Sequence, residues 1–213
     1  MSAESFAPPA PAGMEIAAIV LAAGRGTRFD PAGVRCKLLQ PLPDGRLVIQ
    51  AVCETMLASL DAVTVVCGDR INDIRAALAA LPVNIAHCAD ADIGMGASIR
   101  RGLAGPAPEL GWLMMLGDMP FLQPSTVERV VQSLRAGALI ARPYCLGSPG
   151  HPVAFSAVLG PELRECDPQA GLQAVIKRHA AQLTRIDVDD QGCTSDIDTP
   201  DDLPGGGVKP SVR

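Results

Sequence analysis

Residues 17–29 read Ala17-Ala18-Ile19-Val20-Leu21-Ala22-Ala23-Gly24-Arg25-Gly26-Thr27-Arg28-Phe29 and give the clearest indication of the fold. The first half of this segment is a run of small and β-branched apolar residues, which is typical of a strand buried on both faces. Gly24 and Gly26 lack a Cβ atom, so the main-chain N–H groups after the strand can approach an anion closely. Arg25 and Arg28 add charge-assisted donors. The segment therefore predicts a buried strand that ends in an anion-binding loop.

Two well-known phosphate-binding motifs are excluded here. The P-loop needs a Gly-Lys-Ser/Thr sequence ahead of a helix, and this segment has none. The dinucleotide fingerprint G-x-G-x-x-G fails at its third glycine, because Phe29 stands there. Taken alone, the segment could also be an ordinary glycine-containing turn between a strand and a helix.

Lys37 strengthens the anion-binding interpretation. The chain uses arginine for nearly all of its positive charge, and its other lysines are Lys177 and Lys209. A compact ammonium group shortly after a glycine loop is typical of a phosphate site. We therefore expect Lys37 to contact phosphate.

Strand-like and helix-like segments alternate along the rest of the chain, which indicates a mostly parallel sheet with helices on both faces. Strands are expected at 63–67, 83–87, 112–116, 138–141 and 183–188. Helices are expected at 48–60, 72–81, 97–103, 124–135, 157–165 and 172–180. Proline and glycine punctuate residues 143–152, which predicts a small antiparallel excursion. The expected fold class is a three-layer, doubly wound α/β domain with its ligand at the carboxyl ends of the strands.

Composition limits the possible partners. The net charge of −5 gives no general attraction to nucleic acid or to anionic membranes. The sequence has no uninterrupted apolar run of about 18 residues, the length of a membrane span. The seven cysteines are odd in number and include no C-x-x-C pair, which favours reduced thiols, a cytoplasmic location and no zinc site.

The chain ends differ in composition from the middle. Residues 1–14 are rich in alanine and proline and lack the features of a signal peptide, so a disordered extension is expected there. Residues 204–213 contain three successive glycines and are expected to form a disordered tail. Residues 15–203 are then one domain, since 213 residues of which 48% are hydrophobic can bury a full core.

The letters LAAGRGTRF at 21–29, followed by Lys37-Leu38-Leu39, resemble the nucleotide-binding signature of the nucleotidyltransferase superfamily. The resemblance is greatest to the branch that contains the molybdenum cofactor cytidylyl- and guanylyltransferases, and it covers roughly residues 16–203. It implies a Rossmann-like nucleotidyltransferase fold. It also implies catalytic roles for Arg28, Lys37 and Asp118. The nucleotide-binding residues implied by it are Leu21, Ala22, Ala23, Gly24, Gly26, Lys37, Gly94, Gly96, Ser98 and Asp118.

Asp118 is the strongest single candidate for chemistry. It directly follows an apolar strand, so its carboxylate is expected at the sheet edge, although an aspartate that only turns the chain is the alternative. Gly117-Asp118-Met119-Pro120 resembles the metal-binding Gly-Asp-x-Pro of the superfamily. The segment 196–203 resembles a second acidic motif, from which Asp196 is favoured as the other ligand and Asp198 is the alternative. Oxygen ligands of this kind suit Mg²⁺. The same segment also has the features of a helix N-terminus.

The acceptor side of the site is expected at Gly150, His151 and Pro152, because the segment 147–153 resembles the Gly-x-x-Gly-x-Pro-Val segment of the family. A histidine in a tight turn is otherwise often structural. One departure is clear: residues 166–173 lack the arginine that relatives show in their acceptor-contacting segment. The acceptor could therefore differ from molybdopterin.

The implied reaction moves CMP from CTP to a phosphorylated acceptor, with molybdopterin the favoured acceptor and a molybdoenzyme the expected recipient of the product. CTP is favoured because Ala23 stands where guanylyltransferases tend to have glycine, and its methyl group narrows the space beside the base. Three alternatives remain open at this point. They are a guanylyltransferase, a nucleotidyltransferase for another phosphorylated acceptor, and a non-catalytic chaperone that holds a cofactor for molybdoenzymes.

Overall fold

The apolar run of the sequence forms the central strand of the protein. In the computed structural model, which describes residues 14–169 and 171–204, strand β1 (Ile16–Ala22) is buried at every position except Leu21. It lies between β2 (Val63–Cys67) and β4 (Gly111–Leu116) and is parallel to both. A strand with neighbours on both sides and helices over both faces needs apolar side chains at nearly every position. This requirement explains its composition.

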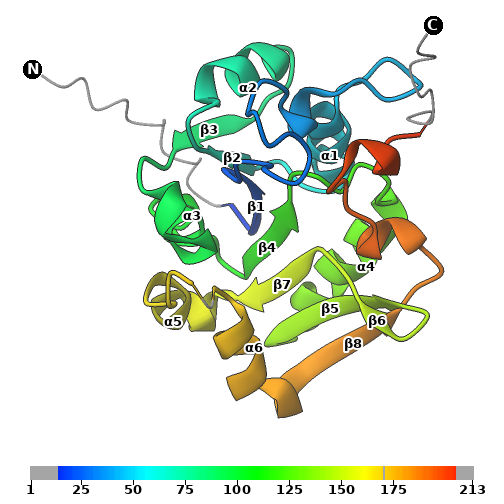
Figure 1. Ribbon diagram of the computed structural model, residues 1–213. Coiled ribbons are helices and arrows are strands. Elements are labelled where there is room, and N and C mark those ends of the chain that lie inside the picture. Colours follow the sequence, from blue (N-terminus) through cyan, green and yellow to red (C-terminus); the bar gives the residue numbers. More distant parts are fainter. Residues whose placement is uncertain (1–13, 170, 205–213) are drawn as a thin grey trace, which may run out of the picture.

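The sheet has the order β3-β2-β1-β4-β7-β5-β6, with β8 paired to β5 (Figure 1). The other strands are β3 (Asn84–His87), β5 (Ile140–Cys145), β6 (Ser148–Pro149), β7 (Val153–Ser156) and β8 (Leu183–Asp187). β7 is antiparallel to β4 and β5, and β6 is antiparallel to β5, whereas β8 is parallel to β5. The predicted mostly parallel sheet with a small antiparallel excursion is confirmed.

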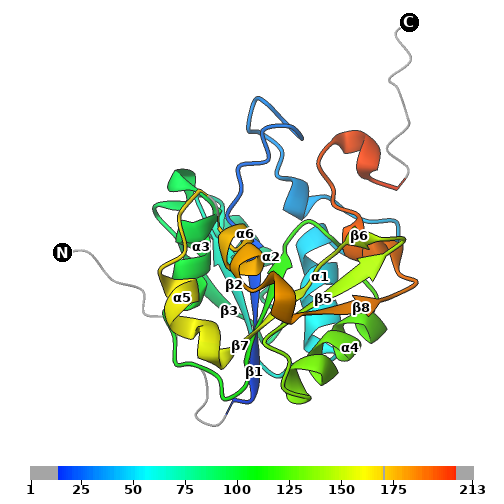
Figure 2. The same ribbon diagram turned by 90° about the horizontal axis from the view of Figure 1, so that it is seen from below.

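Helices cover both faces of the sheet and complete the three layers (Figure 2). One buried cluster includes residues of α1 (Val48–Leu57), α2 (Ile71–Ala77) and α4 (Pro124–Arg135). The other includes residues of α3 (Met95–Gly102), α5 (Gly160–Arg164) and α6 (Gln173–Arg178). The doubly wound α/β class is therefore confirmed.

The strand order opens a crevice between the ends of β1 and β4. The chain passes from β1 outward to β2 and β3, and then returns across the sheet to form β4 on the other side of β1. At such a reversal, the loops after the two strands diverge and leave room for a ligand. The Gly117 amide donates a hydrogen bond of 2.9 Å to the Leu21 carbonyl, which fixes the two strand ends side by side.

The fifth strand is longer than the sequence indicates. We expected it to end at residue 141, before the proline-rich stretch, but β5 continues through Pro143 to Cys145. Proline is tolerated in a strand where its missing N–H has no partner to meet. Here its carbonyl is still used, because it accepts a hydrogen bond of 2.8 Å from the Gly150 amide.

Several helices are shorter than predicted. α2 ends at Ala77 rather than at residue 81, and turns with hydrogen bonds from Ala79 to Ala76 and from Leu81 to Leu78 follow it. Pro82 disfavours helical geometry in Leu81. The helix expected at 157–165 is divided into a 3-10 turn at Ala157–Leu159 and α5, which has Pro161 in its first turn. These differences leave the layers and the strand ends unchanged.

The predicted extension at 1–14 and tail at 204–213 lie outside the described residues, apart from Met14 and Pro204. Within the part of the chain that is described, no helix combines the length and the apolarity that crossing a membrane would require.

Gly102, the last residue of α3, allows this helix to lie directly on the sheet. A Cβ atom at this position would be 2.5 Å from Cγ2 of Ile19 and 3.2 Å from Cγ2 of Val66. Gly102→Ala is therefore expected to destabilise the protein by about 1–3 kcal/mol, the usual cost of overpacking a core. Urea unfolding would measure the change. Gly105→Ala is the matched control, since a methyl group there would meet nothing within 4 Å, and equal midpoints for the two variants would contradict this interpretation.

Candidate active site at the strand ends

The glycine loop follows β1 and borders the crevice. Gly26 adopts a left-handed conformation with φ of +62°, and its carbonyl accepts hydrogen bonds of 3.0 Å from the amides of Phe29 and Asp30. Phe29 is buried, and it anchors the end of the loop in the core. Within the described residues, the amides of 24–28 donate no hydrogen bond. They are therefore available to an anion.

Lys37 begins the 3-10 turn Lys37–Leu39 and reaches the crevice beneath Gly26. Its Nζ lies 2.6 Å from Oδ2 of Asp118 and 3.2 Å from Oδ1 of Asp198. Burial opposes the positive charge, but the hydrogen bonds and charges of Asp118 and Asp198 outweigh it, so the pKa of Lys37 is raised. The ammonium group is thus held charged beside two carboxylates.

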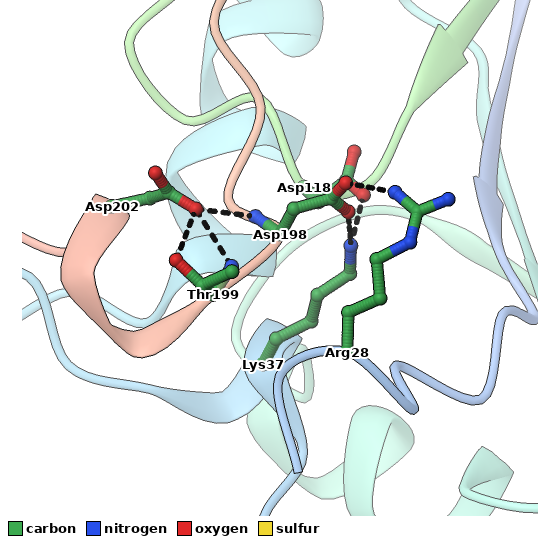
Figure 3. A network of polar contacts seen from close by, with 6 residues as sticks. All are labelled: Arg28, Lys37, Asp118, Asp198, Thr199 and Asp202. Atoms are coloured by element: carbon green, nitrogen blue, oxygen red, sulfur yellow. Dashed lines mark hydrogen bonds and ion pairs between the residues drawn. The ribbon is translucent and has the colours of Figure 1, made fainter. Parts of the chain in front are cut away.

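Three carboxylates meet in front of Lys37. Asp118 follows β4, whereas Asp196 and Asp198 lie near the end of the described chain, and ligand oxygens of all three lie within 4.8 Å of one another. Figure 3 shows Asp118 and Asp198 converging on Lys37, with Arg28 pairing with Asp198 from the glycine loop. The buried Oδ1 of Asp118 has no hydrogen-bond partner within the described residues. The acidic trio therefore presents an unused buried oxygen, as a cation site requires.

The segment of Asp196 and Asp198 is held in place by its neighbours. The Ile197 amide donates a hydrogen bond of 2.9 Å to the Asp118 carbonyl, and the Ile197 side chain is fully buried. Oδ2 of Asp202 accepts hydrogen bonds from the amides of Asp198 and Thr199 (Figure 3). Thr199 is the N-cap of a short 3-10 helix, Pro200–Asp202, so a helix does start in this stretch as expected.

The charge of Asp198 is stabilised by its cationic neighbours. The hydrogen bond and charge of Lys37, followed by those of Arg28, lower the pKa of Asp198. Arg28 itself is exposed, so its pair with Asp198 can open to other anions. Asp198 therefore stays ionised at neutral pH.

A cavity of about 460 Å³ lies over this group. The predicted residues that line it are Leu21, Ala22, Ala23, Gly24, Gly26, Arg28, Lys37, Ser98, Asp118, Asp196 and Asp198. Five further lining residues were not predicted, namely Thr27, Leu38, Ala91, Met95 and Leu116. Thr27 and Leu38 lie inside the motifs that were quoted, and Met95 lies between the two predicted glycines. The position of these residues within those motifs could therefore have identified them as lining the cavity.

Gly94 and Gly96, predicted to bind nucleotide, are not among the lining residues. A Cβ at Gly94 would lie 2.2 Å from the Pro168 carbonyl oxygen, and one at Gly96 would lie 2.4 Å from that of Asp167. The Gly96 amide also donates a hydrogen bond of 2.8 Å to the Pro168 carbonyl. In this structure, both glycines allow the start of α3 to pack against the 167–168 backbone.

The predicted acceptor residues Gly150, His151 and Pro152 are not among the residues that line the cavity. The His151 amide donates a hydrogen bond of 2.7 Å to the Cys193 carbonyl, and a cis peptide bond joins His151 to Pro152. Burial, assisted by the charge of Arg142, lowers the pKa of His151 to about 4. Its imidazole is therefore neutral at pH 7.

Asp190 fastens the segment that leads to the acidic trio. Its buried carboxylate accepts hydrogen bonds from the Thr126 hydroxyl (2.6 Å), the Gln123 amide (3.0 Å) and the Gly192 amide (3.0 Å). Gly192 packs against the backbone of Phe121, where a Cβ would lie 2.0 Å from the carbonyl oxygen. No local motif in the sequence marks Asp190 for this role. Its role depends on distant partners that the local sequence does not reveal.

Asp190→Asn is expected to destabilise the protein by about 1–3 kcal/mol, because an amide group would face N–H donors that the carboxylate now satisfies. Thermal unfolding of the variant would measure the loss. The neighbouring exposed Asp189 provides the control, since Asp189→Asn removes the same charge without these contacts. Equal stability of the two variants would show that Asp190 does not hold the segment.

Comparisons with known proteins show to which family the chain belongs. The chain matches the family described as the MobA-like NTP transferase domain over residues 18–183. Nicotine blue oxidoreductase of Paenarthrobacter nicotinovorans is 30% identical in an alignment of 192 residues that covers 86% of this chain and 92% of that protein. The similarity therefore extends over most of both proteins.

Solved structures show the same architecture. Rv0371c of Mycobacterium tuberculosis H37Rv superimposes with a TM-score of 0.76 at 28% identity, covering 89% of this chain and 96% of that one. A complex of Rv0371c with manganese gives a TM-score of 0.70 over 88% of this chain and 95% of that one. A nucleotidyl transferase of Methanothermobacter thermautotroptrophicus gives 0.74 at 26% identity, over 89% and 94%. The chain belongs to the MobA-like NTP transferase family and is a nucleotidyltransferase.

Proposed function

We propose that this enzyme transfers CMP from CTP to the phosphate of a molybdopterin-type acceptor and releases pyrophosphate, with Mg²⁺ held by Asp118, Asp196 and Asp198. The observation that supports the proposal best is the acidic trio facing Lys37 in a cavity lined by the glycine loop. An anion-binding loop and a cation-binding group on the same cavity suit a metal-bound polyphosphate.

The residues present fit a divalent cation. The unpartnered Oδ1 of Asp118 offers a buried oxygen while Lys37 keeps Oδ2. One oxygen from each of the three carboxylates lies within 4.8 Å of the other two. In an octahedral Mg²⁺ site, the largest distance between two ligand oxygens is about 4.2 Å, so small side-chain movements would suffice to bind the ion. When bound, the cation would supply positive charge between the nucleotide phosphates. The manganese complex of the mycobacterial relative supports a divalent metal in this family.

The chain's own residues would orient the nucleotide and offset its charge. The free amides of 24–28 would donate to the triphosphate oxygens, and Lys37 and Arg28 would stabilise the negative charge that develops on the leaving pyrophosphate. The acceptor phosphate oxygen forms the new bond to the α-phosphorus as the bond from that phosphorus to the β-phosphate oxygen breaks. Such transfer needs alignment and neutralisation of charge rather than covalent participation of the protein.

The choice of CTP rests on the space beside the base. Ala23 lines the cavity, and its methyl group favours a pyrimidine over the larger guanine. Ser98, which is buried at the start of α3, also lines the cavity and offers a hydroxyl group to a base or ribose. The carbonyl oxygen and the amine of cytosine can accept and donate such bonds.

Two other functions are distinguishable from this one. A chaperone that only holds a cofactor has no use for three carboxylates arranged for a cation. An oxidoreductase, as the name of the Paenarthrobacter relative would suggest, needs a redox partner and no pyrophosphate leaving group. The acidic trio therefore favours nucleotidyl transfer.

Removal of the lysine should slow the reaction strongly. Lys37→Ala is expected to lower turnover by about 10²- to 10³-fold, because one preorganised donor to the developing charge is lost. Pyrophosphate release under saturating CTP and acceptor would measure it. Lys177→Ala removes an exposed lysine of α6 and serves as the control. Normal turnover of Lys37→Ala would remove the proposed role.

Loss of one metal ligand should weaken both binding and turnover. Asp118→Asn is expected to reduce Mn²⁺ affinity by at least about 10- to 100-fold, because loss of a residue that only hydrogen-bonds to a metal ligand already reduces the affinity by this factor. Manganese titration followed by electron paramagnetic resonance would report binding directly. Asp61→Asn, an exposed change outside the cavity, is the matched control. Unchanged Mn²⁺ binding in Asp118→Asn would contradict the metal site.

The function itself is tested by pyrophosphate release. Each of the four nucleoside triphosphates would be supplied in turn with Mg²⁺ and purified molybdenum cofactor, with EDTA and Asp118→Asn as controls. Release with CTP alone, abolished by both controls, is the expected result. Tight CTP binding without release would indicate a cofactor-holding protein, and release with GTP would overturn the choice of base.

A further inference from the structure

The three carboxylates of the acidic trio are not equally available to a metal ion. Oδ1 of Asp118 has no hydrogen-bond partner within the described residues, and Asp196 is exposed. Both oxygens of Asp198 are occupied, since Oδ1 lies 3.2 Å from Nζ of Lys37 and Oδ2 accepts a hydrogen bond from Nη1 of Arg28 (Figure 3). Because cations repel one another, Asp198 must give up one of these partners before it can bind a metal ion.

Arg28 is the partner that can leave. Its side chain is 76% exposed, whereas that of Lys37 is 13% exposed and also pairs with Asp118 at 2.6 Å. An ion pair of such an exposed side chain contributes little to stability, so it opens easily. Opening it would free Oδ2 of Asp198 and leave the contact between Lys37 and Asp118 intact.

The pair connects two distant segments on the wall of one cavity. Arg28 belongs to the glycine loop after β1, and Asp198 lies 170 positions further along the chain, yet both line the cavity of about 460 Å³. The planar fork of a guanidinium group matches the oxygens of a phosphate, and the amides of the same loop are free to bind one. A polyphosphate in this cavity would therefore compete with Asp198 for Arg28.

We propose that the Arg28–Asp198 ion pair is a latch that couples the two ligands of the site: a polyphosphate draws Arg28 away, and Asp198 is thereby released for the metal ion. Arg28 is then a positioning residue for the metal site, in addition to its contact with pyrophosphate. Coupling between two binding free energies is reciprocal, so a metal ion at Asp198 also releases Arg28 for the polyphosphate. The inference rests on the proposed function in taking a triphosphate and a divalent cation to share this cavity.

Mn²⁺ binding without nucleotide tests the latch independently of turnover. In Arg28→Gln, the Mn²⁺ affinity measured by electron paramagnetic resonance is expected to rise about 2- to 5-fold, because Asp198 has lost a cationic partner. The matched control is Arg25→Gln on the same loop, since Arg25 pairs with Asp92 at 3.7 Å and its loss should leave the affinity unchanged. An unchanged or lower Mn²⁺ affinity in Arg28→Gln would overturn the proposal.

A double-mutant cycle separates the latch from a general effect of charge. In the Asp198→Asn background, Arg28→Gln is expected to leave the Mn²⁺ affinity unchanged, because Arg28 no longer holds a carboxylate there. A rise as large as the one in the wild-type background would mean that Arg28 acts on the whole site through its charge alone. That result would refute the latch.

Binding of inorganic pyrophosphate in the presence of EDTA tests the other side of the coupling. Asp198→Asn is expected to raise the pyrophosphate affinity measured by calorimetry about 2- to 5-fold, because Arg28 is no longer engaged, and to have no such effect in the Arg28→Gln background. Equal effects in both backgrounds, or no pyrophosphate binding by any of these proteins, would contradict the latch.

The outcomes distinguish the latch from the proposed function. If Mn²⁺ and pyrophosphate binding behave as expected but the wild type transfers no CMP, the proposed function fails and the latch stands. If the wild type transfers CMP but Arg28→Gln binds Mn²⁺ no more tightly, the latch alone fails.

Discussion

The ion pairs of the Lys37 ammonium group with Asp118 and Asp198 hold the site together. Three carboxylates that approach within 4.8 Å of one another repel, and water screens this repulsion less at the half-buried Asp118 and Asp198 than at the exposed Asp196. Lys37 and Arg28 place two positive charges against these three negative charges. The remaining negative charge and the unpartnered Oδ1 of Asp118 favour a further cation. A protein that held this group without one would keep an avoidable electrostatic cost.

The fold brings these groups together from distant parts of the chain. The reversal of strand order places the ends of β1 and β4 side by side, and this arrangement brings Lys37 to Asp118. The returning chain is then fixed by Asp190 and by the buried Ile197. The Ile197 side chain is buried, whereas Asp196 is exposed, Asp198 is half-buried, and both line the cavity. The sequence left open which of these two aspartates accompanies Asp118, and in the structure oxygens of both lie within 4.8 Å of an Asp118 oxygen.

The local sequence was sufficient to predict those features that depend on a single segment of the chain. The apolar run at 16–22 predicted the central strand, and the glycines and Asp118 after the strand ends predicted the crevice. The local sequence could not predict contacts with residues that lie far away along the chain. The tight packing of Gly94 and Gly96 depends on the backbone of Asp167 and Pro168, far along the chain, and the bonds to Asp190 come from equally distant residues. Likewise, Pro143 looked like a strand end because its sheet partners could not be known.

Reactions differ within one fold because the fold fixes strand ends and leaves the side chains there free to vary. A nucleotidyl transferase and an oxidoreductase both resemble this chain over nearly its whole length, so architecture alone does not choose between them. The chemistry of the strand ends does. A redox reaction gains nothing from three carboxylates gathered around a lysine, whereas a reaction that builds negative charge on pyrophosphate requires cations at that place. The electrostatic cost of the acidic trio is therefore the strongest argument for phosphate chemistry in this protein.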